Sequence, residues 1–136
     1  MVTVVATVIV LGILITVHEL GHFLLAKLLG VRVEAFSLGF PPKLLSRKIG
    51  DTEYRLSFVP LGGYVKLLGE NPNVEVPPEL EPYSFLHRPL WQRFLIVLAG
   101  PGFNLLFAAL ALFLVFAVSG IPYVPTDIGG VKPDSP

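Results

Sequence analysis

Two apolar stretches of membrane-spanning length constrain this chain more than any other feature of its sequence. The first runs from about Val2 to Leu29 and the second from Phe94 to Val118, with few polar interruptions in either. About 20 apolar residues are enough to cross the hydrocarbon core of a bilayer as an α-helix. Because lipid offers no hydrogen-bond partner to an exposed backbone, the sequence predicts two transmembrane helices.

The composition agrees with a membrane protein and argues against several other classes. Apolar residues make up 53% of the chain and charged residues only 15%. With a formal net charge of zero, the chain lacks the basic footprint of a nucleic-acid-binding protein. It contains no cysteine, so it offers neither disulfide bonds nor thiolate metal ligands. We expect no cleaved signal peptide, because no basic region precedes the first apolar stretch.

The basic residues predict the orientation in the membrane. Of the ten Lys and Arg residues, only Lys132 lies beyond the second apolar stretch. The positive-inside rule then places the loop 30–93 in the cytoplasm and both ends of the chain on the opposite side.

The strongest chemical signal is an H-E-x-x-H motif, His18-Glu19-Leu20-Gly21-His22, at the end of the first apolar stretch. Residues four apart share one face of an α-helix, so His18 and His22 can bind one Zn²⁺. Glu19 is then placed to take a proton from a metal-bound water. Two histidines that merely form hydrogen bonds are the alternative. That alternative gives no reason for three costly polar groups to cluster in an apolar helix.

The region 31–69 is predicted to form a small antiparallel β sheet. Apolar and polar residues partly alternate in 31–38 and 52–59, and turn signals follow at 39–42 and 60–63. This pattern predicts three or four strands. So small a sheet buries little core by itself, which suggests that it leans on the membrane. An ordinary cytoplasmic hairpin domain fits the composition equally well.

The region 70–93 is predicted to be a cytoplasmic linker that ends in an interfacial segment. Prolines and acidic residues are typical of an exposed linker, and aromatic and basic residues just before a helix are typical of an interfacial anchor. His87 is a weak candidate metal ligand, because a lone His beside an Arg is more often a surface residue.

The second helix, predicted over 94–119, contains two small residues and one polar residue of interest. Gly100 and Gly102 would allow close contact with another helix. The amide of Asn104 needs a partner inside a bilayer, either as structural glue between helices or at a site that faces the metal.

These motifs together resemble the site-2 protease family of intramembrane zinc metalloproteases, in its bacterial regulator-of-sigma-E branch. The resemblance is carried by the helix ending in H-E-x-x-H, Gly62-Gly63-Tyr64-Val65-Lys66, Trp91-x-Arg93 and Ala99-Gly100-Pro101-x-x-Asn104. It implies an α-helical membrane protein in which two transmembrane helices flank a small membrane-associated antiparallel β sheet. It also implies that Gly63, Tyr64 and Val65 help receive the substrate, and that Asn104 orients substrate or stabilises the oxyanion.

The resemblance further implies a zinc endopeptidase of the bacterial inner membrane that cleaves transmembrane segments. The implied partners are membrane lipid and a transmembrane protein substrate, such as an anti-sigma factor or a signal-peptide remnant. In that family the third zinc ligand is an Asp on a later helix, which nothing here matches. We therefore expect an N-terminal portion that is inactive alone, with 120–136 as the start of a PDZ-like domain.

Two non-catalytic alternatives remain open at this point. A membrane metal-binding or transport protein would use the histidine pair without hydrolysis, although the second span offers no acid or histidine to help. A membrane anchor or partner-binding fragment is the other alternative. A later apolar segment that bears an Asp would favour the protease.

Overall fold

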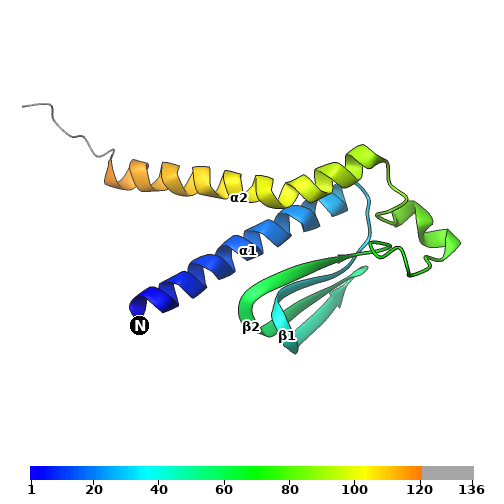
Figure 1. Ribbon diagram of the computed structural model, residues 1–136, viewed down its shortest axis with the longest axis horizontal. Helices are drawn as coiled ribbons and strands as arrows, with labels where there is room; N and C mark the ends of the chain where they lie inside the picture. Colours follow the sequence, from blue (N-terminus) through cyan, green and yellow to red (C-terminus); the bar gives the residue numbers. More distant parts are fainter. Residues whose placement is uncertain (121–136) are drawn as a thin grey trace, which may run out of the picture.

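The computed structural model describes residues 1–120, apart from the side chains of Pro60 and Leu61. Its elements are α1 (Val2–Leu28), β1 (Val33–Ile49), β2 (Thr52–Leu67), the short 3₁₀ helix η1 (Pro78–Tyr83) and α2 (Leu90–Ser119). The long helices run in opposite senses, meeting where α1 ends and α2 begins and diverging toward their other ends (Figure 1). The expected start of a PDZ-like domain falls almost wholly on 121–136, outside the described residues.

The C-terminal end of α1 is closed by a Schellman motif centred on Gly30. The Gly30 N–H donates to the carbonyl of Lys27, and the Val31 N–H donates to that of Ala26. Gly30 has a φ of 73°, a conformation that glycine adopts without steric cost. Ala26 and Val31 are both fully buried, so the cap also turns the chain into the core. β1 follows almost at once, at Val33.

α2 begins at Leu90, earlier than the predicted start at Phe94. The carbonyl of Pro89 accepts hydrogen bonds from the N–H groups of Gln92 and Arg93, which closes a polar first turn. Trp91 and Arg93, expected in an interfacial segment, therefore belong to the helix. The hydropathy pattern predicted the helix only from Phe94, where the continuous apolar run begins. The first turn was missed because a helix can begin after a proline whatever the hydropathy of the residues that follow.

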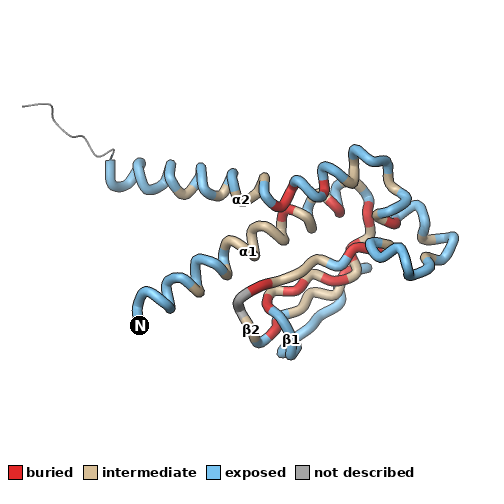
Figure 2. The backbone as a smooth tube through the Cα atoms, viewed as in Figure 1, coloured by how far each residue is buried: buried red, intermediate tan, exposed pale blue. Residues whose placement is uncertain are grey.

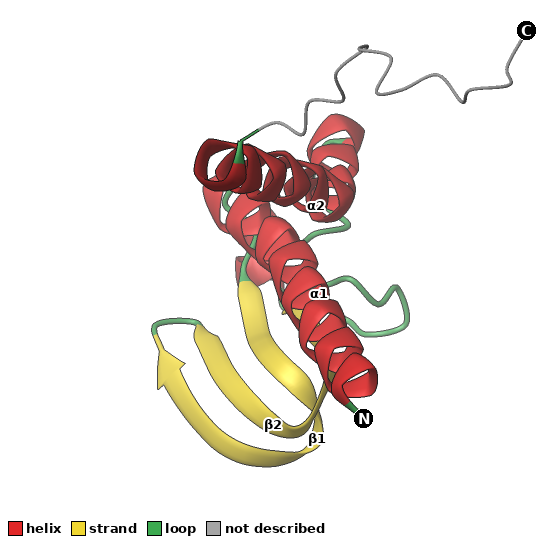
Figure 3. Cartoon of the chain, turned by 90° about the vertical axis from the view of Figure 1, so that its left-hand side faces the viewer, coloured by secondary structure: helices red, strands yellow, loops and turns green. Residues whose placement is uncertain are grey.

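The predicted small antiparallel sheet is present, and its neighbouring segments belong to one long hairpin of two strands, β1 and β2. The hairpin bends back on itself, so that residues 35–38 pair with 63–66 on one side and with 53–56 on the other. The predicted turns at 39–42 and 60–63 are therefore bends inside two long strands. Figure 3 shows the resulting curved sheet alongside α1.

The fold-back decides which strand segments lie at the edges of the sheet. The strand segments lie side by side in the order 43–49, 53–57, 35–38 and 63–67. The two edges are therefore 43–49 and 63–67. The second of these lies next to α1, as the contacts of Gly63 show below.

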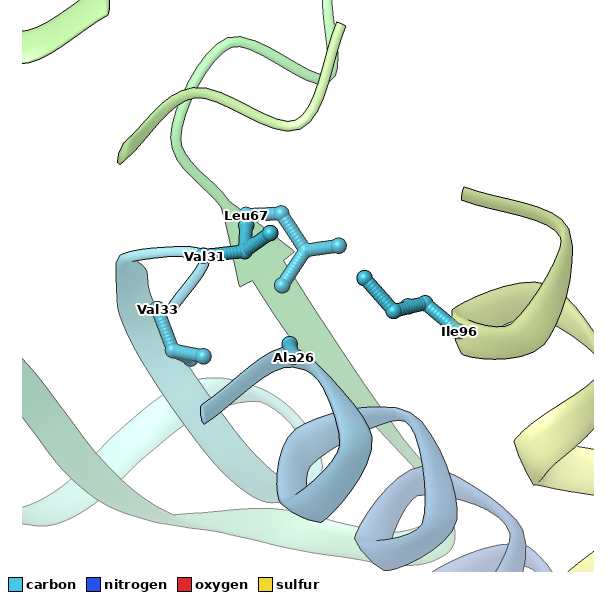
Figure 4. Close-up of a cluster of buried hydrophobic side chains, with 5 residues drawn as sticks. All are labelled: Ala26, Val31, Val33, Leu67 and Ile96. Carbon is cyan, nitrogen blue, oxygen red and sulfur yellow. The ribbon is translucent and has the colours of Figure 1, made fainter. Parts of the chain in front are cut away.

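A small core lies where the two helices and the sheet meet. Its buried members are Ala26, Val31, Val33, Leu67 and Ile96 (Figure 4). We call this region the junction, and it comprises residues 18–31 with the first turns of α2 (90–104) and the adjoining strands. The remainders of the helices, 2–15 and 105–119, are here called the arms, and they are almost entirely exposed (Figure 2).

The arms make both helices candidates for membrane spans. α1 has 27 residues and α2 has 30, and each contains a long apolar window that is not buried inside the protein. Both helices are thus long and apolar enough to cross a bilayer.

Candidate active site

The two histidines of the H-E-x-x-H motif project from α1 toward α2. Their ring centroids lie 4.8 Å apart, with an angle of 79° between the ring planes. Both rings face Gly100. A Cβ placed on Gly100 would stand 2.4 Å from His22 Nε2 and 2.6 Å from His18 Nε2. The two Nε2 atoms therefore border one small space, which exists because residue 100 has no side chain.

The chemistry of this pair fits a zinc ion. Both Nε2 atoms lie against Gly100, and zinc binds histidine nitrogen at about 2.0–2.1 Å. Imidazole nitrogen is also a favoured zinc ligand. Among residues 1–120 no group of three or more His, Asp or Glu side chains gathers around one point. Within the described part of the chain, His18 and His22 thus provide a pair of metal-binding nitrogens.

The backbone carbonyl of Ile96 fixes the tautomer of His22. Nδ1 of His22 lies 2.7 Å from this oxygen. Since a carbonyl oxygen can only accept, Nδ1 carries the proton and Nε2 keeps its lone pair. Histidines that bind metals usually donate their second N–H in this way. Sequence reasoning missed this contact, because every residue type at position 96 would offer the same carbonyl.

Asn104 lies against the other histidine. Its Nδ2 is 3.5 Å from His18 Nδ1, while its Oδ1 is buried and has no hydrogen-bond partner among the described residues. The structure thus brings Asn104 next to one of the two histidines, on the side of the ring away from Gly100.

Glu19 faces the sheet instead of α2. A Cβ on Gly63 would stand 3.5 Å from Glu19 Cγ and 2.7 Å from the carbonyl oxygen of Ser37. The missing side chain of Gly63 therefore lets the strand edge approach Glu19 closely. The motif helix thus presents its histidines to α2 and the Cγ of Glu19 to the sheet.

The other two predicted substrate-binding residues lie on the same edge segment. The Tyr64 hydroxyl accepts a hydrogen bond of 2.6 Å from Arg55 Nη1. Val65 is partly buried and packs against the core cluster. The backbone of this edge comes close to Glu19 at Gly63, where a Cβ would stand 3.5 Å from Glu19 Cγ.

An ion-pair network on the sheet holds Arg55 in place beside Tyr64. Arg55 and Lys43 both bond to the Glu53 carboxylate. The pKa of Glu53 is lowered from its ordinary value of 4.5 to about 2. The hydrogen bond from Arg55 is the largest cause, and the hydrogen bond from Lys43 is the next. The same bond to Glu53, followed by the bond to Tyr64, raises the pKa of Arg55. The guanidinium therefore stays charged while it donates to Tyr64.

Close approach of the two helices depends on Gly21 and Gly100. A Cβ on Gly21 would stand only 2.4 Å from the carbonyl oxygen of Ala99. A Cβ on Gly102, by contrast, would meet nothing within 4 Å. The prediction of a close contact is therefore right for Gly100 and wrong for Gly102, because two residues of helix rotation turn position 102 away from α1.

His87 takes part in local contacts before α2. Its Nδ1 is 3.1 Å from Ser84 Oγ and its Nε2 is 4.0 Å from a carboxylate oxygen of Glu81. These neighbours belong to its own segment, which agrees with a surface histidine.

Comparison with known proteins agrees with this geometry. Residues 6–132 match the model of peptidase family M50. The chain is 50% identical to protease RseP of Yersinia pestis over 96% of its length. It is 46% identical to the regulator of sigma-E protease RseP of Escherichia coli over 94%. A Vibrio cholerae protein with the provisional name of zinc metalloprotease is 48% identical over 96%.

The matched region covers only 29%, 28% and 29% of these relatives, so the chain spans less than a third of their length. The family match nevertheless includes the H-E-x-x-H motif, the sheet and all of α2. It confirms the resemblance inferred from the motifs. The chain belongs to peptidase family M50.

Proposed function

We propose that this chain is the N-terminal catalytic portion of an intramembrane zinc metalloprotease that cleaves transmembrane segments of membrane proteins. The convergence of His18 Nε2 and His22 Nε2 beside Gly100 carries the proposal. The names of the relatives, zinc metalloprotease and regulator of sigma-E protease, support it. A third zinc ligand is expected from a part of the protein beyond Pro136.

Each residue of the site has a distinct task in this proposal. His18 and His22 hold zinc through their Nε2 atoms, and the Ile96 carbonyl keeps the His22 ring oriented. Zinc, when bound, supplies a Lewis acid for the scissile carbonyl and lowers the pKa of a coordinated water. Glu19 accepts the proton of the attacking water and returns it to the leaving amine.

The substrate is proposed to bind as an added strand. A transmembrane helix hides its carbonyls in its own hydrogen bonds, so it must be extended before a protease can attack it. In the described residues, the edge 63–67 pairs only on its inner side, with 33–38. Because Gly63 lies beside Glu19, a peptide on this edge would bring its backbone to the site.

An apolar groove next to this edge suits the side chains of such a substrate. The groove has a volume of about 390 Å³ and follows α1 from Val8 to Val17. Leu38 and Leu56 line its other wall, on the sheet. Its walls match the apolar side chains of a membrane segment.

The proposed location is the bacterial inner membrane, with both helices spanning and the loop 30–93 on the cytoplasmic side. The exposed arms and the basic loop support this orientation. Exposed apolar side chains on the sheet, such as Leu45 and Phe58, support contact between sheet and lipid. A single cysteine placed in 73–80 should react with an impermeant reagent only from the cytoplasmic side, and labelling from outside would overturn the orientation.

The replacement Glu19→Gln tests the proposed chemistry. In the purified full-length protein it should lower cleavage of a model transmembrane substrate by on the order of 100-fold or more, because the proton-transferring group is lost. Zinc content should be unchanged, since both histidines remain. Glu34→Gln is the matched control, because Glu34 pairs with Lys66 on the sheet. Near-normal cleavage by the Glu19→Gln variant would refute the proposal.

A further inference from the structure

We infer that Asn104 is the positioning residue for His18. Its side-chain oxygen accepts a hydrogen bond from His18 Nδ1–H, which keeps His18 Nε2 unprotonated and free for zinc. The inference rests on the proposed function and assigns Asn104 a task other than substrate binding or helix packing.

The pattern of residues along α2 points to this role. Ile96, Gly100 and Asn104 are each four apart, so they form one row along the face of α2 that meets α1. On α1, His22 lies against Ile96 and His18 lies against Asn104, with Gly100 between them. The row therefore presents a hydrogen-bonding group, a gap and a second hydrogen-bonding group to the histidine pair.

The tautomer of His18 decides which end of the amide must face the ring. If Nδ2 donates to His18 Nδ1, the ring proton sits on Nε2 and occupies the lone pair that a metal needs. If Oδ1 faces the ring, Nδ1 donates and Nε2 keeps its lone pair. A half-turn of the amide exchanges the two ends without moving any other atom. Only the second arrangement makes His18 equivalent to His22.

A side chain is required at this position, whereas a backbone carbonyl serves His22. Beside His22 the carbonyl of Ile96 reaches Nδ1 at 2.7 Å. The group next to His18 Nδ1 is the side-chain amide of Asn104, whose Nδ2 lies 3.5 Å from it. The Oδ1 atom is partnerless among the described residues, so it is available for this bond.

Two replacements separate the acceptor role from the other roles of Asn104. Asn104→Asp keeps an acceptor of the same shape but removes the N–H donor. Asn104→Leu keeps the approximate volume but removes both. Thr7→Val is the control for loss of a polar group, because the Thr7 hydroxyl donates to the Thr3 carbonyl of its own helix.

The measurements are zinc affinity, by competition with a chelator, and the visible absorption spectrum after Co²⁺ substitution, both in the purified full-length protein. Asn104→Leu should weaken zinc binding by about 10- to 100-fold and change the Co²⁺ spectrum. Asn104→Asp should bind zinc as the unmodified protein does and retain cleavage. Thr7→Val should change neither.

Two results would overturn the inference while leaving the proposed function intact. Normal zinc affinity and an unchanged Co²⁺ spectrum in Asn104→Leu would show that Asn104 only packs the helices. Loss of cleavage in Asn104→Asp with zinc retained would show that its N–H acts on the substrate. If the unmodified protein bound no zinc, the proposed function would fail together with this inference. Should Asn104→Leu not fold, Asn104→Ala removes the same acceptor with a smaller side chain, and the same two zinc and Co²⁺ measurements on it decide between the acceptor role and packing.

Discussion

The junction and the arms belong to the same two long helices, yet they are used in opposite ways. At the junction the buried positions of the helices include the small residues Gly21, Ala26, Ala99 and Gly100. In the arms, large apolar side chains such as Val10 and Leu110 remain more than half exposed.

The close contact at the junction depends on particular small residues, because a Cβ on Gly21 would stand 2.4 Å from the carbonyl oxygen of Ala99. In lipid there is little hydrophobic gain from bringing two apolar helices together, so close backbone approach at small residues is what favours contact. The same approach brings the polar groups of α1 and α2 within reach of one another. The site lies where Gly21 and Gly100 allow this approach.

The largest expected effect comes from adding one methyl group at the junction. Gly100→Ala would place a Cβ 2.4 Å from His22 Nε2 and 2.6 Å from His18 Nε2, so both proposed zinc ligands would have to move. Zinc binding and cleavage should both fall by on the order of 100-fold, because displacement of catalytic groups by about 1 Å has effects of that size. Metal analysis and a cleavage assay on the full-length protein measure both.

Gly102→Ala is the matched control for this change. It adds the same methyl group to the same helix, where nothing lies within 4 Å. Its zinc content should equal that of the unmodified protein. Equal zinc content in the two variants would show that the ion lies elsewhere and would remove the distinction between Gly100 and Gly102.

A second pair of replacements compares the junction with an arm directly. Ile96 is 1% exposed and Leu110 is 55% exposed. Ile96→Ala should lower the free energy of unfolding by about 2–5 kcal/mol, because it leaves a cavity in the core. Leu110→Ala should change it by no more than about 0.5 kcal/mol. Reversible denaturation in detergent compares the two, and equal losses would contradict the division into junction and arms.

The smallest expected effect lies on the sheet, outside both regions. The pKa of Glu53 is lowered from 4.5 to about 2, so its ion pairs stabilise the fold above pH 4.5 and are lost as the pH falls toward 2. Glu53→Gln should therefore flatten the fall in melting temperature over this range. At pH 7 zinc binding should be unchanged. Glu75→Gln in the linker is the control, and an equal flattening there would contradict the assignment.

The elements that depend on side-chain pattern could be predicted from the sequence. The two long helices follow from apolar length, the antiparallel pairing follows from alternation, and the family follows from the motifs. Each of these has a cause that lies in the residues themselves.

The features that depend on backbone geometry could not be predicted. The return of β1 onto the far side of β2 is a bend that turn residues permit but do not specify. The acceptor for His22 is a backbone carbonyl, so residue 96 gave no signal. The contact at Gly21 was missed because the motif leaves that position unspecified, although its Cβ would collide with Ala99.

Under the proposed function, the short passage from α1 into β1 has a consequence for where a substrate would be cut. Only residues 29–32 separate the two elements, and Arg88 donates to the Gly30 carbonyl between them. The position of the sheet edge 63–67 relative to Glu19 is therefore fixed. A peptide on that edge could shift only by two residues at a time, because a slip of one turns its side chains over. Alternative cleavage points in one substrate would then be spaced in even numbers of residues.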